Sequence, residues 1–366
     1  SEARAAFDQL SGEAYASAKS LFVEQSGLIR TAMIDRLRAS FGAVGASSAP
    51  VVSYEGGGPG ALAYAAPSGA SPVQVAADMC LPVKAVTRPA TTERIALWAT
   101  GFGSWADMDG NGNAAGLSSD TGGFLIGADT PLADGWRLGV TGGYSYSSFD
   151  VSGRNASGDS DNWHVGAYAG NQWGPLGLRT GLAYTWQDVE TSRNVAFPGF
   201  ADQLSGDYDA GTFQAFGELG YAFDAAFAAF EPFVNLAYVR LDTDGFGERG
   251  GAAALTVAGS DMDTTFATLG LRASVPFQLG GAAAKLRGMA GWRHAFGNIV
   301  PLTTQAFFGS DSFTVAGVPI AEDAAVLEAG LDVLVGASTT LGVAYTGQFG
   351  DGVTQNGFNA TLKVSF

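Results

Sequence analysis

The sequence predicts an all-β membrane protein: a twelve-stranded antiparallel transmembrane β-barrel with an N-terminal α-helix expected in the lumen. The first observation is segment 358–366, where apolar and polar residues alternate up to a terminal Phe366. A strand with this period of two has one apolar and one polar face. The second observation is a hairpin pattern that repeats along 95–366, and the third is an isolated helix before it. The alternative for 358–366 is the last edge strand of a soluble sandwich.

Composition excludes several classes of function. The chain has 366 residues, a net charge of −16, 53 glycines and a single cysteine, Cys80. Such acidity argues against binding nucleic acid through its phosphates. One cysteine cannot form an intrachain disulfide framework or a cysteine-based zinc site. Glycine at about twice its usual share indicates many short, tightly turned strands.

Residues 1–42 are predicted to form an amphipathic helical segment, with Gly42 as its C-cap. The alternative is a core helix of a soluble domain, but the sequence predicts no second long helix that could pack against it. One apolar stripe has spacings of seven, four, four and four: Phe22, Ile29, Met33, Leu37 and Phe41. Three arginines lie in the C-terminal part, where cations suit the helix dipole: Arg30, Arg36 and Arg38.

A change of composition marks residues 43–92. Proline, glycine, alanine and serine dominate there, charged residues are few, and the run 56–60 is a strong breaker of regular structure. This segment is therefore predicted to be a linker between the helix and a barrel that occupies 93–366.

Twelve strand-like segments follow the linker, and an even number is usual in single-chain bacterial barrels. They lie at 95–105, 121–129, 136–148, 162–173, 178–189, 212–224, 230–241, 264–277, 283–296, 324–336, 339–349 and 355–366.

The connections between these segments alternate in length. Short turns at one end and long loops at the other are typical of a membrane barrel whose long loops face outside. Short turns are predicted at 131–135, 174–177, 225–229, 278–281 and 337–338. Longer loops rich in Asp, Gly, Asn and Ser are predicted at 106–120, 150–161, 190–209, 242–263 and 297–323.

The faces of the predicted strands separate lipid-facing from lumen-facing residues. The alternation assigns charges of both signs to the lumen: Glu218, Glu328 and Asp332 with Arg179, Arg272, Arg287, Arg293 and Lys363. It assigns aromatic residues to the membrane interfaces: Tyr144, Tyr184, Trp186, Tyr238 and Trp292. Because a charged helix is compatible with a polar lumen, we expect Arg30, Arg36 and Arg38 to pair with the lumen acids and the helix to plug the pore.

Several stretches, in this order, resemble one known family. They are the run 7–17, the helix end 30–38, a Pro/Gly-rich linker, and the segments 97–105, 231–239 and 269–273, followed by Phe366. Together they resemble the translocator domain of monomeric autotransporters, the type V secretion systems. The resemblance covers nearly the whole chain. Each motif alone is loose, but their order and spacing are specific.

The resemblance implies a twelve-stranded outer-membrane barrel, a helix threaded through its pore, and an N-terminal passenger that is exported with it. The passenger and any targeting segment would lie upstream of Ser1. It also implies a monomer surrounded by outer-membrane lipid and lipopolysaccharide, and a terminal strand that the barrel-assembly machinery reads through Phe358, Leu362, Val364 and Phe366. One departure is the lack of an Asn-Asn pair in the helix, where one branch of the family cleaves itself.

The sequence offers little for catalysis or cofactor binding. His164 and His294 fall on separate predicted strands, and 158–160 matches only the start of an esterase motif, without its strand–turn–helix context. Asp107 and Asp109 open a run like the first half of a calcium loop, but its twelfth position holds serine and not glutamate. We therefore predict no enzyme, no cofactor and no dedicated metal site, with weak calcium binding left open.

Two functional classes remain. The first is a secretion translocator, and the second is a passive porin or structural barrel. The helix separates them, because a porin has no use for about forty helical residues before its first strand. An enzyme is a more distant third class, since some members of the resembled family carry a hydrolase as passenger.

Overall fold

The computed structural model describes residues 2–46, 51–53, 95–335 and 339–364. The predicted turn at 337–338 and residue Phe366 lie outside them, and so does most of the predicted linker 43–92.

Two helices replace the single predicted segment 1–42. α1 spans Glu2–Leu10 and α2 spans Glu13–Phe41. Gly12 separates them in a left-handed conformation with φ of 62°, which is open to glycine at little cost. Gly42 ends α2 with φ of 64°, and the N–H of Ala43 donates to the carbonyl of Arg38. This is the glycine C-cap that the sequence predicted.

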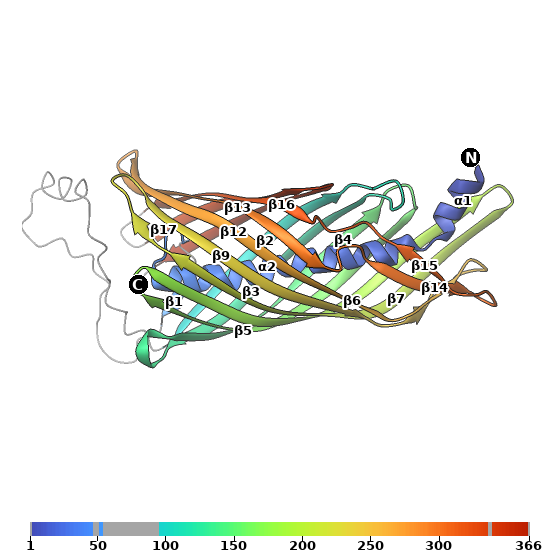
Figure 1. The fold of residues 1–366 in the computed structure, drawn as a ribbon, viewed down its shortest axis with the longest axis horizontal. Helices are drawn as coiled ribbons and strands as arrows, with labels where there is room; N and C mark the ends of the chain where they lie inside the picture. The colour runs from blue at the N-terminus through green and yellow to red at the C-terminus, as the bar shows by residue number, and fades with distance from the viewer. Residues whose placement is uncertain (1, 47–50, 54–94, 336–338, 365–366) are drawn as a thin grey trace, which may run out of the picture.

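Twelve antiparallel strands form a closed barrel among the described residues (Figure 1). The barrel closes through pairing of β2 with both β3 and β18. The strands are β2 (Ala96–Met108), β3 (Leu117–Pro131), β4 (Arg137–Val151), β5 (Ala156–Trp173), β6 (Leu176–Phe197), β7 (Phe200–Tyr221), β9 (Ala229–Thr243), β12 (Ser260–Leu279), β13 (Ala282–Gly297), β16 (Asp323–Leu334), β17 (Thr339–Gly350) and β18 (Val353–Val364). Two short elements flank them: the 3₁₀ turn η1 (Ala133–Gly135) and β8 (Phe223–Asp224), which pairs with β9.

The seam between the first and last strands is paired over only part of its length. β18 pairs with β2 from Val353↔Met108 to Phe358↔Gly103. The beginning of β2 pairs instead with β1 (Val51–Ser53), with Val52 opposite Leu97. A strand from the linker therefore occupies part of the β2 edge that β18 leaves open.

The two ends of the barrel differ. The short-turn end carries the turns after β3, β5, β7 and β12, and the first barrel strand begins there. The long-connection end carries the segments 244–259 and 298–322, and α2 begins near it (Figure 1).

The predicted loop at 190–209 is wrong, because β6 and β7 continue as a hairpin to Phe197 and Phe200. Most of the predicted loop 150–161 is likewise strand. Buried Val195 and Leu204 extend the inward alternation into the 190–209 hairpin.

The two long connections combine into a second sheet at this end. Its strands are β10 (Phe246–Gly247), β11 (Leu255–Val257), β14 (Leu302–Phe307) and β15 (Phe313–Ala316), in the order β10-β11-β14-β15. We call this four-stranded element the lid sheet. It joins segments that belong to two different barrel hairpins.

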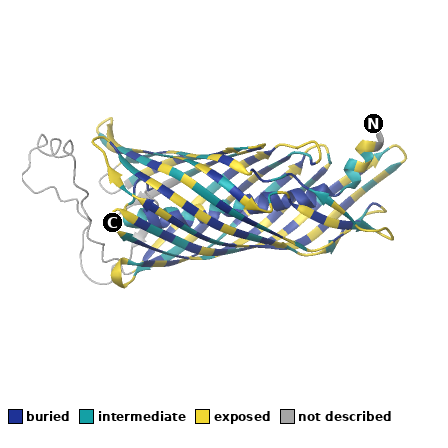
Figure 2. Cartoon of the chain, viewed as in Figure 1, coloured by how far each residue is buried: buried dark blue, intermediate teal, exposed yellow. Residues whose placement is uncertain are grey.

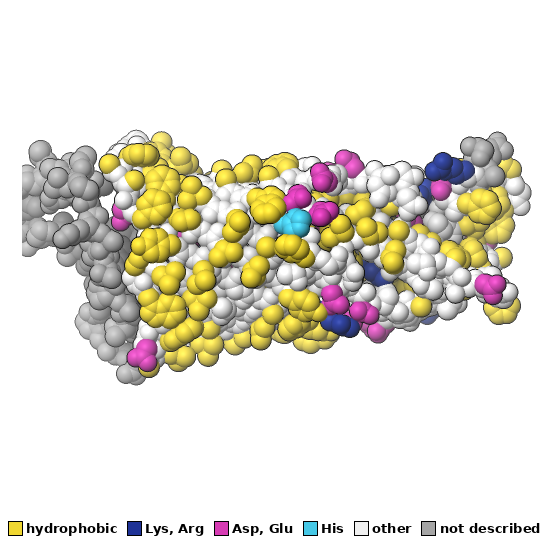
Figure 3. All heavy atoms as spheres, viewed as in Figure 1, with side chains coloured by type: hydrophobic (Ala, Val, Ile, Leu, Met, Phe, Trp, Pro, Cys, Tyr) yellow, Lys and Arg dark blue, Asp and Glu magenta, His cyan; other side chains and the backbone are white. Residues whose placement is uncertain are grey.

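Exposed and buried residues alternate along the barrel strands, while α2 is largely buried inside (Figure 2). In β13, Leu286 and Trp292 are exposed, whereas Arg287 and Arg293 are buried. Apolar side chains are densest on the part of the visible wall nearer the short-turn end, and most acidic side chains on this face lie near the middle of its length (Figure 3). Within the described part of the chain, no helix is both long and apolar enough to span a membrane.

Candidate functional site in the barrel lumen

The lumen is occupied by α2, which packs against β3 to β7 and β9 of the barrel wall and against β14 and β15 at the long-connection end. Its predicted apolar stripe meets glycines on β5. A Cβ atom at Gly166 would come within 2.8 Å of the Cε atom of Met33. A Cβ atom at Gly170 would come within 3.2 Å of both Leu37 and Phe41. These glycines therefore make room for the side chains of the helix against the wall.

One carboxylate, Asp129 of β3, joins the C-terminal half of α2 to the wall. The Arg36 guanidinium donates to both of its oxygens, at 2.5 and 2.8 Å. Arg137 of β4 donates to it as well, and the Tyr168 hydroxyl donates at 2.9 Å. The Trp98 indole N–H donates to that hydroxyl at 2.5 Å. All five side chains are buried, so this Asp129 cluster is shielded from solvent.

A second ion pair holds the middle of the helix. Here the acid belongs to the helix and the arginine to the wall, the reverse of the Arg36–Asp129 pair. Arg293 of β13 donates to both carboxylate oxygens of Glu24, each at 2.8 Å. Gln348 of β17 donates to the same carboxylate at 3.2 Å. Arg293 also lies 4.5 Å from the centre of the Phe266 ring, and Arg30 of the helix lies 5.8 Å from the same ring. The bidentate geometry fixes both the height and the rotation of α2 in the lumen.

Two acids and two arginines of the wall form a separate buried cluster. Arg179 and Arg272 each contact both Glu218 and Glu231, with nitrogen–oxygen distances of 2.8 to 3.1 Å. Arg179 is directly opposite Glu218 in the β6–β7 ladder, and Arg272 is opposite Glu231 in the β9–β12 ladder. The Arg272 guanidinium also lies 3.7 Å from the centre of the Phe233 ring.

The expected pairing of the helix arginines with Glu218, Glu328 and Asp332 is wrong. Glu328 pairs with Arg287, whose Nε also lies 3.6 Å from Asp332. Arg38 pairs with Asp35 of its own helix at 2.6 Å and donates to the carbonyl of Val44 at 2.8 Å. Arg30 donates to Gln214, and Arg36 to Asp129. The wall acids already have cations on neighbouring strands, so they do not depend on the helix for charge balance.

The helix does not fill the lumen completely. A cavity of about 250 Å³ remains beside it, lined by α2 and by wall residues of β2, β7, β9, β12, β13, β16, β17 and β18. Gly27, Thr31 and Asp35 line the helix side, and Ser104 and Gln355 line the seam. The open space therefore reaches the seam but also extends along the wall as far as β7.

Comparison with known families identifies this arrangement. The family described as the autotransporter beta-domain matches residues 97–346, which is more than half of the chain. The chain is an autotransporter β-domain. This membership places the barrel in the bacterial outer membrane, as the sequence predicted.

Relatives and solved structures agree with this family. The β-domain is 38% identical over 270 residues to an extracellular serine protease of Serratia marcescens, covering 74% of the chain and 26% of that protein. The chain thus spans about a quarter of the length of this relative. It matches the translocator domain of NalP from Neisseria meningitidis with a TM-score of 0.61 at 15% identity, covering 80% and 93% of the two chains. It matches the β-domain of Bordetella BrkA with a TM-score of 0.56 at 24% identity, covering 75% and 100%.

The histidines of the β-domain do not form a catalytic constellation. His164 lies in the lumen wall, where its ring nitrogens contact the hydroxyls of Ser145 at 2.9 Å and Thr185 at 2.8 Å. In Ser-His-Asp and Cys-His-Asn triads a carboxylate or amide orients the imidazole, whereas the neutral hydroxyl of Thr185 occupies that place here. His294 lies on β13, 2.8 Å from Asp323 on the exposed face.

The calcium-like run of the β-domain does not form one loop. Asp107 lies within β2 and pairs with Ser118 and Thr354. Asn111 accepts hydrogen bonds from the N–H groups of Asn113 and Ala114, so it shapes a turn. Among the residues that the structure describes, no group of three or more His, Cys, Asp or Glu side chains is placed to hold a metal ion.

The mouth of the β-domain contains two further features. Glu13 contacts Arg154 at 2.7 Å and accepts from the N–H of Ala115. Burial raises the pKa of the Glu13 carboxyl, and these two partners oppose the rise.

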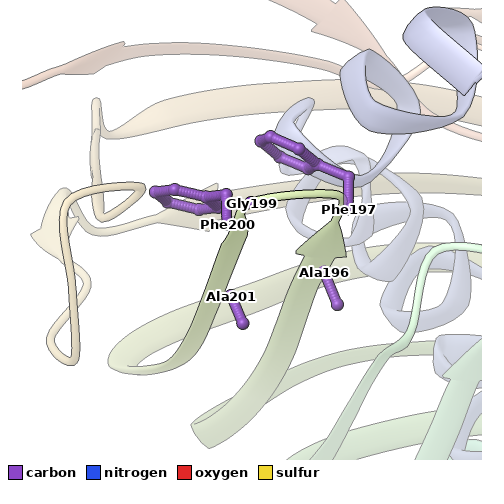
Figure 4. Close-up of a pocket in the computed structure, with 5 residues that line it drawn as sticks. All are labelled: Ala196, Phe197, Gly199, Phe200 and Ala201. Atoms are coloured by element: carbon purple, nitrogen blue, oxygen red, sulfur yellow. The ribbon is translucent and has the colours of Figure 1, made fainter.

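At the tip of the β6–β7 hairpin, the rings of Phe197 and Phe200 stack on one side, with Ala196 and Ala201 on the other (Figure 4). The hollow between them is lined by these four residues and Gly199, so no polar side chain faces it.

Sequence reasoning missed Glu24, Asp129 and Glu231, although each contributes to a buried ion pair. Asp129 and Glu231 lie at the ends of the predicted strands 121–129 and 230–241. The alternation of inward and outward residues, continued to these ends, would have placed both side chains in the lumen. Lys363, Leu362 and Val364 lie in β18, but the structure describes no side chain there, and Phe366 is outside the described residues. Phe358 points outward and is 58% exposed.

Proposed function

We propose that this β-domain brings a passenger, joined upstream of Ser1, to the cell surface and then retains α2 in the lumen as a plug. The observation that carries the proposal is the seating of α2. Two buried ion pairs of opposite polarity, Glu24–Arg293 and Arg36–Asp129, attach it to the wall. A passive porin would gain nothing from a helix attached in this way.

In this proposal the long-connection end faces the exterior. α2 begins at that end, so a passenger ahead of α1 emerges outside, while both ends of the barrel itself are on the periplasmic side (Figure 1). Residues 1–42 are the plug and passenger junction, 43–92 the linker, and 93–366 the barrel. The barrel functions as a monomer in outer-membrane lipid, with lipopolysaccharide around its outer half.

The passenger is proposed to carry any enzymatic activity, because the translocator fold itself is not catalytic. Two relatives that match about three quarters of the chain are named extracellular serine proteases. A secreted protease is therefore the first kind of passenger to test.

Surface display of a reporter tests the proposal. An epitope-tagged peptide is placed behind a signal peptide and ahead of Ser1, and intact cells are treated with protease. We expect loss of the epitope from intact cells, while the barrel remains heat-modifiable on gels. The same peptide behind a signal peptide alone is the control and should stay protected. Protection of the peptide in the full fusion would favour the porin alternative.

We also propose that Phe366, with Phe358, Leu362 and Val364, is read by the barrel-assembly machinery. Loss of one large apolar side chain costs about 1.5–3 kcal/mol at most, a small part of the stability of a barrel. Phe366→Ala should therefore refold from urea in detergent with nearly normal yield, yet give little heat-modifiable barrel in cells. Equal failure in both settings would make Phe366 a structural residue, and normal assembly in both would remove its role as a signal.

A further inference from the structure

The lid sheet packs directly on the first three turns of α2. One close approach is at Gly317, just after β15. A Cβ atom at Gly317 would lie 2.3 Å from the backbone nitrogen of Ser17 and 2.5 Å from the carbonyl carbon of Ala16. Both helix residues are fully buried. The backbone of the lid connection therefore rests on the backbone of the helix, and only glycine fits at this contact.

Hydrogen bonds make this contact specific for particular helix residues. The N–H of Val318 donates to the Ser17 hydroxyl at 3.0 Å, and the Ser20 hydroxyl donates to the carbonyl of Val318 at 2.6 Å. Both backbone groups of Val318 are thus satisfied by helix side chains. The Lys19 ammonium donates to the carbonyl of Leu302 at 2.6 Å. Without these partners, buried backbone groups of the connection would be left unpaired, which is costly.

The start of α2 meets the lid sheet in the same way. Gly12 has a left-handed conformation, and a Cβ atom there would lie 2.5 Å from the Leu255 Cδ1 atom of β11. The Gln305 side-chain amide of β14 donates to the carbonyl of Ser11. Tyr15 donates to Glu248 at 2.5 Å, in the connection that carries β10 and β11. The lid sheet thus contacts the helix from both of its connections.

We propose that the lid sheet is a recognition site for the segment 11–20 of this chain and closes only when that segment occupies the mouth of the lumen. The proposal rests on the proposed function, because it assumes that other chain passes through the mouth first. A passing segment with larger side chains cannot lie under Gly317. A segment without hydroxyls at the positions of Ser17 and Ser20 cannot satisfy Val318. The lid sheet therefore distinguishes the segment 11–20, which arrives last, from the passenger segments that pass through the mouth before it.

Accessibility of the helix under the lid sheet tests the proposal in the full chain. Cys80→Ser removes the native thiol, and Ala18→Cys places a probe at a fully buried position of α2. The probe is labelled with a membrane-impermeant maleimide on intact cells. Gly317→Val is the test variant. Gly247→Val is the matched control, because Gly247 lies in the same sheet and an added Cβ there meets no atom within 4 Å.

Gly317→Val should speed labelling of the probe by about tenfold or more, because the lid no longer seats on the helix. Gly247→Val should label like the parent. Equal rates in Gly317→Val and Gly247→Val would overturn the proposal. If Gly317→Val gives no heat-modifiable barrel, Ser17→Ala with Ser20→Ala removes only the helix hydroxyls, and parental labelling there would overturn it too.

The surface reporter separates this proposal from the proposed function. If the lid proposal alone is wrong, the reporter is still displayed while the labelling rates stay at the parental level. If the proposed function is wrong, the reporter is protected in every variant, and the proposal falls with it because no passenger crosses the mouth.

Discussion

At the scale of single residues, Asp129 accepts four hydrogen bonds from three buried side chains. One buried carboxylate accepts from two guanidinium groups and from a tyrosine, which come from the helix and from two strands. Paired charges of this kind are stabilised mutually, so removal of one leaves the others uncompensated in a poorly solvated place. The single acid therefore matters more than any one of the arginines around it.

Asp129→Asn should lower the free energy of unfolding by about 3–5 kcal/mol, because two buried cations lose their counter-charge. Urea unfolding in lipid vesicles, followed by tryptophan fluorescence, measures this change. Asp242→Asn is the control, since the pair of Asp242 with Arg240 is solvent-exposed and should contribute little. A similar small effect for both variants would contradict the role assigned to Asp129.

At the scale of elements, α2 is positioned by polarity as much as by apolar packing. Its middle presents an anion to Arg293, and its C-terminal half presents a cation to Asp129. Glu24 and Arg36 are twelve residues apart, or about 18 Å along a helix. An inverted helix would bring like charges together at both contacts, and a shifted helix would break both pairs, so these pairs define one orientation and one height.

Glu24→Arg should release the plug, because it places a new cation against Arg293 and near Arg30. We expect higher single-channel conductance in planar bilayers than for the parent. The double variant Glu24→Arg with Arg293→Glu should return conductance toward the parental value by restoring a pair. Phe7→Ala on exposed α1 is a control and should change nothing. If the double variant conducts like Glu24→Arg alone, the ion pair between residues 24 and 293 does not hold the helix.

At the scale of the whole molecule, the seam is the part of the barrel where two different strands can pair with the same edge of β2. Continuing the β2–β18 register six residues beyond Phe358↔Gly103 brings Val364 opposite Leu97. In the structure Val52 of β1 is opposite Leu97 instead. β1 and the end of β18 could therefore pair with the same edge of β2. Residues of β2 and β18 also line the lumen cavity. Pairing by either strand satisfies backbone groups that lipid cannot.

Disulfide trapping decides between the two pairings in a Cys80→Ser background. Val52→Cys with Leu97→Cys should cross-link on oxidation, because opposed residues on paired strands are within reach of a disulfide. Leu97→Cys with Val364→Cys should cross-link poorly. The opposite result would mean that β18 pairs with β2 along its full length and that β1 is displaced.

Much of the architecture followed from local pattern. All twelve predicted segments overlap barrel strands, since alternation with period two and glycine-rich turns are properties of neighbouring residues. The loop at 190–209 was wrong because its many polar residues resemble loop composition, although Val195 and Leu204 preserve the inward alternation. The break at Gly12 was missed, although the pair Ser11-Gly12 was an available turn signal.

The sequence by itself determined the barrel, its strand number, the faces of its strands and the presence of a helix that needs a polar enclosure. It could do so because each of these depends on the order of residues along one strand or one helix. Only the tertiary structure decided which charges meet, how the lid sheet forms from two distant connections, and which strand takes the seam. Those outcomes depend on strand register and on the position of α2. Glu218 lies opposite Arg179 in the β6–β7 ladder, whereas Arg36 contacts Asp129 because of the height of α2 in the lumen.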